Sequence, residues 1–91
     1  MIEPALDHEV YETEYLIYRK YKYDNKKTYT VYVMNKALNV VLSVIKWHGP
    51  WRKYCEFREP DTIFDESCNR DVADYIRMLM DERKVEKRLN K

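Results

Sequence analysis

The sequence predicts an α+β fold, in which an antiparallel sheet carries one long C-terminal helix packed on one of its faces. Residues 14–57 form short runs rich in Tyr, Val and Thr, separated by polar turns, as is typical of a meander of strands. After Pro60 the apolar residues recur at helical spacing. Ninety-one residues, 45% of them apolar, are enough for one compact domain and too few for two.

The first two predicted strands form a hairpin. Residues 14–23 and 28–34 are rich in aromatic and β-branched side chains, and the polar residues 24–27 between them predict a turn. A helix is the alternative for the first of these strands. Tyr11, Tyr15 and Tyr18 also follow helical spacing, so a helix could precede or replace that strand.

Two further strands complete a sheet of three to four strands. Residues 40–47 follow a turn at 35–39 and are the most apolar run, which predicts a central strand. Gly49 and Pro50 predict a tight reversal into a last strand over residues 51–57, whose register the sequence leaves open.

A helix is predicted over residues 66–87, with Asp65 or Ser67 as its N-cap. Its apolar face holds Cys68, Val72, Tyr75, Ile76 and Leu79. Residues 14–88 are therefore expected to form a single domain, with residues 89–91 frayed. Residues 1–13 are an acidic segment whose order the sequence leaves open.

A single helix can cover only one face of the sheet, so the other face should be exposed. Strict alternation assigns the following residues to the core face: Tyr29, Val31, Val33, Val40, Leu42 and Val44. It leaves an apolar patch of Tyr32, Val41, Ile45 and Trp47 on the opposite face. We expect Tyr32, Val41 and Ile45 to form an interface between copies, in a homodimer or higher homo-oligomer.

The formal net charge of +1 hides a segregation of charge along the chain. Residues 1–18 hold five acids and no Lys or Arg, whereas residues 19–58 hold ten Lys and Arg and two acids. Such a basic block can attract an anionic partner. Alternatively, the acidic segment lies against the basic sheet of its own chain or of a neighbour.

The candidate binding site surrounds the turn between the last two strands. It comprises Tyr32, Trp47, His48, Trp51, Arg52, Lys53 and Tyr54. Such side chains can stack on planar rings and hold phosphate or carboxylate groups. In the alternative interpretation Trp47 and Trp51 only close the end of the core, with Arg52 bridging to acids of the helix.

Catalytic and metal-binding patterns are thin, so we expect no enzyme, no cofactor and no metal site. His8, His48, Cys55 and Cys68 lack the spacing of a zinc site, and one Gly is too few for a phosphate-binding loop. A small enzyme would have to use His48 and Cys55. The two cysteines are expected to be reduced. No stretch is long and apolar enough to span a membrane, so we expect a cytoplasmic protein.

Three short motifs resemble a group of small uncharacterised proteins of bacteriophages and bacterial genomes. They are Trp51-Arg52-Lys53-Tyr54, Thr62-Ile63-Phe64 and Cys68-Asn69-Arg70-Asp71-Val72. The resemblance covers residues 28–80, and Glu56 and Arg58 depart from it. It implies a phage or mobile-element origin, in the host cytoplasm if phage-encoded, and no assigned activity.

These observations favour a non-catalytic accessory protein that binds a host protein or a small, nucleotide-like anionic ligand. By that binding it would interfere with a host or defence process. The alternative is a nucleic-acid-binding module that uses the basic, aromatic block of residues 19–58.

Overall fold

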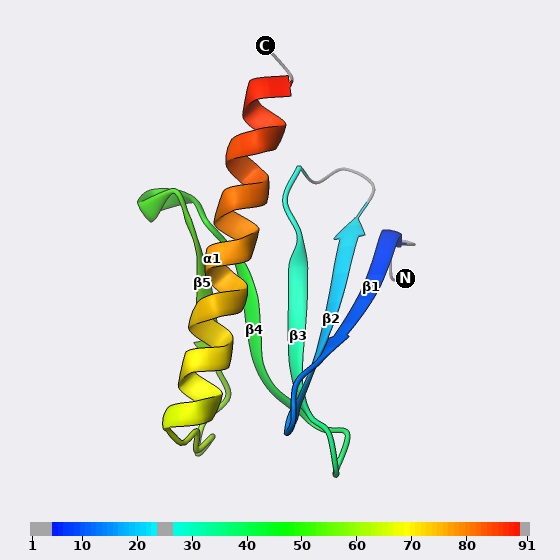
Figure 1. Cartoon of the computed structure of the whole chain (residues 1–91), viewed down its shortest axis with the longest axis vertical. Coiled ribbons are helices and arrows are strands. Elements are labelled where there is room, and N and C mark those ends of the chain that lie inside the picture. Colours follow the sequence, from blue (N-terminus) through cyan, green and yellow to red (C-terminus); the bar gives the residue numbers. More distant parts are fainter. Residues whose placement is uncertain (1–4, 24–26, 90–91) are drawn as a thin grey trace.

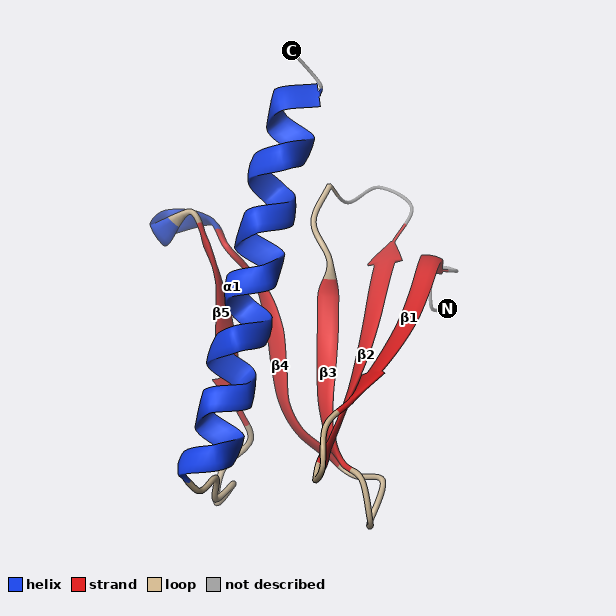
Figure 2. Ribbon diagram, viewed as in Figure 1, coloured by secondary structure: helices blue, strands red, loops and turns tan. Residues whose placement is uncertain are grey.

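The structure, a computed structural model, describes residues 5–23 and 27–89. It contains a five-stranded antiparallel meander with one long helix, α1 (Glu66–Leu89), on one face (Figures 1 and 2). The strands, in sheet order, are β1 (Ala5–Glu12), β2 (Leu16–Tyr23), β3 (Thr30–Asn35), β4 (Val41–His48) and β5 (Lys53–Arg58). The predicted α+β fold is confirmed, with one strand more than expected. Most of the first predicted turn and the last two residues of the predicted frayed end lie outside the described residues.

The additional strand is β1, at the acidic start of the chain. It pairs with β2, so that Tyr11 lies opposite Tyr18 and Glu9 lies opposite Lys20. A short link joins the two strands, in which the amide of Thr13 donates to the carbonyl of Leu16 at 2.9 Å. The tyrosines at helical spacing therefore belong to two strands and their link. The acidic segment, from Ala5 on, lies beside a basic strand of its own chain.

The hydrophobic core lies between α1 and the sheet. Three helix residues one or two turns apart, Val72, Tyr75 and Leu79, are buried as predicted. They pack in one cluster with the sheet residues Leu16, Tyr18, Val31, Val33, Ile45 and Tyr54. The rings of Tyr18 and Tyr75 are stacked at its centre, with their centroids 4.5 Å apart. Burial raises the pKa of both phenols far above the usual value.

The beginning of α1 is fixed by its cap. A carboxylate oxygen of Asp65, one of the two predicted caps, accepts the backbone N–H of Cys68 at 2.8 Å. This hydrogen bond lowers the pKa of Asp65. The preceding segment is held to the sheet, because the hydroxyl of Thr62 donates to the carbonyl of Leu42 at 3.0 Å.

A β-bulge in β4 corrects the predicted faces of that strand. Val33 lies opposite Ser43 while Met34 lies opposite Val41, so Leu42 is an extra residue. Beyond it the alternation is inverted, since one added residue exchanges the two faces of a strand. Leu42 packs on the core as predicted, but Ile45 is fully buried beneath α1 and cannot form an exposed patch or an interface between copies.

Three further residues of the predicted strand lie elsewhere than expected. Trp47, expected on the exposed face, packs against the core. Val44, expected in the core, pairs with Tyr32 and Phe57 and lies with them on the opposite face. Val40 precedes the strand and is 49% exposed.

Candidate functional site

The candidate site is the sheet face opposite α1, called here the open face. The strand register aligns its side chains in rows that cross the sheet. The central row comprises Arg19, Tyr32, Val44 and Phe57. The next row comprises Tyr21, Thr30, Lys46 and Cys55. Every one of these residues alternates with a residue of the core face, so together they form one continuous surface.

Aromatic rings contact one another across the open face. The ring of Tyr21 meets that of Tyr32 edge-on, with centroids 5.7 Å apart. Toward β5 on the same face, the ring of His48 lies between the rings of Phe57 and Trp51, with centroid distances of 6.0 and 5.0 Å. Rings that pack on each other in this way are held in place before any ligand arrives.

A shallow groove of about 380 Å³ crosses one half of the open face. It is lined by Arg19, Tyr21, Tyr23, Tyr32, Met34 and Val41. A hydrogen bond with Tyr32 raises the pKa of Tyr23 at this groove. The groove therefore combines flat rings with one guanidinium.

The charge of the open face is positive. Lys46 lies over the ring of Phe57, with its ammonium 4.9 Å from the ring centroid, and Arg19 and Lys53 flank it on other strands. Among the described strand positions that face this side, Glu12 is the sole acid, and it pairs with Lys36 at 3.7 Å. Part of the basic block of the sequence therefore lies on the open face, while Lys20 and Lys22 lie on the helix side beside Tyr29.

The structure divides the predicted binding residues between the two faces. Tyr32 and His48 lie on the open face, and Trp51, which is 67% exposed, lies at its edge beside His48. Trp47 and Tyr54 lie on the helix side, where their rings meet edge-on at 5.3 Å. Tyr54 is buried, and its hydroxyl accepts the backbone N–H of Tyr29 at 3.1 Å.

Of the two tryptophans of the turn, Trp47 packs against the core, whereas Trp51 is exposed. Trp47 closes the core, and its ring carries the guanidinium of Arg83 at 5.4 Å. Arg52 and Lys53 are exposed, and neither forms an ion pair within the described part of the chain.

Sequence reasoning missed Arg19, Tyr21, Lys46 and Phe57 as members of this surface. Lys46 could not be assigned to this face because the bulge exchanges the faces of β4. Phe57 could not be assigned because the sequence does not determine the register of the last strand. Arg19 and Tyr21 alternate with the buried Tyr18 and Lys20, and that alternation was the available signal.

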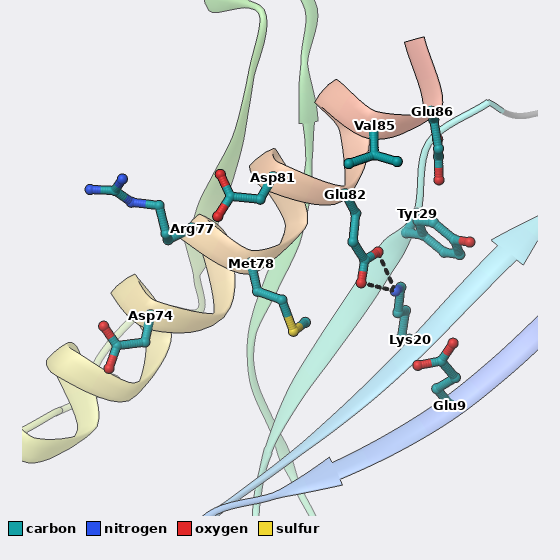
Figure 3. Close-up of a pocket in the computed structure, with 10 residues that line it drawn as sticks. All are labelled: Glu9, Lys20, Tyr29, Asp74, Arg77, Met78, Asp81, Glu82, Val85 and Glu86. Atoms are coloured by element: carbon teal, nitrogen blue, oxygen red, sulfur yellow. Dashed lines mark hydrogen bonds and ion pairs between the residues drawn. The ribbon is translucent and has the colours of Figure 1, made fainter. Parts of the chain in front are cut away.

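A second hollow lies on the helix side, between the second half of α1 and strands β1 and β2 (Figure 3). This cleft measures about 750 Å³. Its apolar surface comes from Tyr29, Met78 and Val85, and its acids are Glu9, Asp74, Asp81, Glu82 and Glu86.

Lys20 lies at the bottom of this cleft and is only 2% exposed. Its ammonium lies 2.9 and 3.3 Å from the two carboxylate oxygens of Glu82 and 4.1 Å from the ring centroid of Tyr29 (Figure 3). The buried cation is thus neutralised within the chain, as burial of a charge requires. The four other acids of the lining outnumber its one other cation, Arg77, so the cleft has a net negative charge.

Metal and thiol chemistry have little support in the described residues. No group of three metal-binding side chains occurs among residues 9–23 and 27–87. Cys55 and Cys68 are both free thiols, and burial raises the pKa of Cys68, which disfavours its reactive thiolate. In the same part of the chain, no helix has the length and apolar character needed to cross a membrane.

Comparison with known proteins gives one informative match. The uncharacterised 9.3 kDa protein of Acholeplasma phage L2 is 41% identical over 76 residues, which are 84% of this chain and 97% of the phage protein. The chain belongs to the family of this phage protein. The predicted resemblance to small phage proteins is thereby confirmed. No family model and no solved structure matches the chain.

The three motifs that indicated this phage family lie mainly at structural positions. Tyr54, Cys68 and Val72 belong to the core or pack on it. Phe64 also packs there, and the guanidinium of Arg58 lies 4.5 Å above its ring. The motifs thus combine residues of the core with the exposed Trp51, Arg52 and Ile63.

Proposed function

We propose that this phage protein is a non-catalytic binding protein whose open face holds single-stranded nucleic acid. The observation that carries the proposal is the alternation of aromatic rings and cations on one uncovered sheet face. The rings are Tyr21, Tyr32 and Phe57, and the cations are Arg19, Lys46 and Lys53.

These groups suit both parts of a nucleotide. Bases stack on aromatic side chains with about 1–3 kcal/mol per base, whatever their sequence. Lysine and arginine neutralise phosphates and release counterions, which makes binding dependent on salt. Lys46 lies over the ring of Phe57, so a base that stacks on this ring would displace the ammonium toward the neighbouring phosphate.

The shape of the open face favours single strands over duplex. Reading duplex DNA requires an element that enters a groove, usually a helix or a protruding ribbon. In this structure the helix packs on the opposite face, and the open face consists of the strands themselves (Figure 2). Unpaired bases can lie flat on such a surface.

Fluorescence anisotropy with a labelled single-stranded oligonucleotide tests the proposal. Tyr32→Ala and Phe57→Ala should each weaken binding by roughly 5-fold or more, because each removes one stacking platform. Arg70→Ala, on the exposed surface of α1, is the control and should bind like the wild type. Equal affinity of all four proteins, or tighter binding of duplex than of single strands, would refute the proposal.

A second candidate is a nucleotide-like ligand or a host protein on the same face, through which the protein would interfere with a host or defence process. The groove between Arg19 and the tyrosines supports it, since a single planar anion could occupy that groove. A rise in melting temperature with mononucleotides, without retention of oligonucleotides, would favour this candidate.

Self-association through the open face is a further use of the same residues. Tyr32 and Val41 remain at the surface there, whereas Ile45 does not. Light scattering would distinguish it, because Tyr32→Ala would then lower the molar mass of the particle in solution.

A further inference from the structure

We infer that the acidic cleft beside α1 receives the Trp51–Lys53 turn of a second copy of this chain, so that copies associate head to tail. The inference uses neither the rings nor the cations of the central rows of the open face. It shares only Lys53 with the proposed function, whereas Arg52, Asp74 and Asp81 belong to the inferred contact alone.

The cleft offers an apolar surface between carboxylates. Asp74, Met78, Asp81 and Val85 form one stripe along α1, in which acids alternate with apolar side chains (Figure 3). Met78 and Val85 are 42% and 52% exposed, so the cleft offers their apolar surface to a partner. At about 750 Å³ the cleft is large enough for a bulky side chain together with a cation.

The lining of the cleft holds five acids and only two cations, Lys20 and Arg77. Lys20 is bound to Glu82 at the bottom, and Arg77 extends away from Lys20 and Tyr29 (Figure 3). Asp74 and Asp81 form no ion pair within the described part of the chain. The rim is thus complementary to an incoming positive group.

The turn between β4 and β5 has the opposite character. Trp51, Arg52 and Lys53 are consecutive and exposed. The turn projects from the sheet on the side of α1 that is remote from β1 and β2 (Figure 1). Arg52 has a φ of 52°, and its N–H donates to the carbonyl of Gly49 at 3.1 Å, so the loop is closed on itself. A preformed loop loses little conformational entropy on binding.

Charge and shape together indicate the same occupant. An indole placed on Met78 and Val85 would bury apolar surface, while Arg52 and Lys53 would meet Asp74 and Asp81. The turn and the cleft are different surfaces of one molecule, so the contact is heterologous. Such contacts produce open chains of copies unless the rotation between them closes a ring.

Sedimentation velocity over a range of protein concentrations at about 50 mM salt tests the inference. The wild type should shift to larger species as its concentration rises. Arg52→Glu with Lys53→Glu, and separately Asp74→Lys with Asp81→Lys, should each need at least tenfold more protein to reach the same shift. Circular dichroism establishes that each double variant keeps the fold.

The decisive experiment mixes the two double variants. Each reversed surface then finds a complementary one, so the mixture should associate where neither variant does alone. Glu66→Lys, which reverses a charge at the start of α1 outside the cleft, should associate like the wild type. Tyr32→Ala should also associate normally, which separates this contact from the open face.

Two results would overturn the inference. One is a wild type that stays monomeric at all concentrations up to about 1 mM, well above the Kd of ordinary specific association. The other is unchanged association of both double variants, which would assign self-association to another surface.

Discussion

At the scale of single residues, Lys20 shows how the fold accommodates a buried charge. Its ammonium is held between Glu82 and the ring of Tyr29, and β1 covers it from the side of Glu9. Removing the carboxylate of Glu82 would leave the buried ammonium without compensation, whereas replacing Lys20 by an apolar group would leave a carboxylate that is 39% exposed and can be solvated.

Glu82→Gln should therefore lower the free energy of unfolding by about 1–3 kcal/mol, the range for leaving a buried polar group poorly bonded. Lys20→Met should cost less, since Met fills the same space without a charge. Urea denaturation measures both. Glu66→Gln is the control, because its partner Arg70 is exposed and surface pairs contribute little. A Lys20→Met variant less stable than Glu82→Gln would contradict this account.

Tyr18 gives a second prediction at this scale. It is fully buried and stacked on Tyr75, and its hydroxyl has no hydrogen-bond partner among the described residues. Tyr18→Phe keeps the stacked ring and removes a desolvated polar atom, so stability should stay equal or rise by up to about 1–2 kcal/mol. A loss of more than about 1 kcal/mol in thermal or urea unfolding would show that the hydroxyl is bonded.

At the scale of elements, the start of α1 depends on the ionised form of Asp65. Its folded-state pKa is lowered by the N–H of Cys68, so its contribution to stability is complete above the unfolded value near 3.9. The contribution is lost as the pH falls from there through the lowered folded value. The amide of Asn can accept the same hydrogen bond without titrating.

Thermal unfolding between pH 7 and pH 2.5 checks this cap. The difference in melting temperature between the wild type and Asp65→Asn should shrink or change sign below about pH 3.9, where the wild-type carboxylate becomes protonated. Asp65→Ala should melt below both at pH 7. A constant difference between the wild type and Asp65→Asn over the whole range would exclude a charged cap.

The elements also show how far sequence reasoning can reach. Helix α1, its cap and its buried face followed from period and capping chemistry, which are local properties. The faces of β4 did not follow, because the single extra residue Leu42 inverts the alternation and no local pattern marks it. Ile45 and Trp47 were consequently placed on the wrong face.

Strand β1 was missed for a related reason. Tyr11 follows helical spacing with Tyr15 and Tyr18 as well as strand alternation, and pairing with β2 selects the strand. The candidate site was therefore predicted in part. Tyr32 and His48 were found, while Lys46 and Phe57 required the register of two strand pairs.

At the scale of the whole molecule, the near-neutral chain has two surfaces of opposite character, the open face and the cleft beside α1. The open face joins rings to cations, and the cleft on the helix side joins apolar side chains to carboxylates. Such a distribution attracts an anion to one side and a cation to the other, independently of the net charge. It is the common basis of the proposed nucleic-acid binding and of the inferred contact between copies.

Binding of single-stranded nucleic acid by the open face should depend on salt in a way that reflects the number of its cations. The most direct test is a salt titration of oligonucleotide affinity from about 50 to 200 mM, for the wild type and Lys46→Ala. With three cations on the face, affinity should fall about 20-fold over this range, and Lys46→Ala should reduce the logarithmic slope by about 0.7. No binding at 50 mM salt, or a slope unchanged by Lys46→Ala, would contradict the claim.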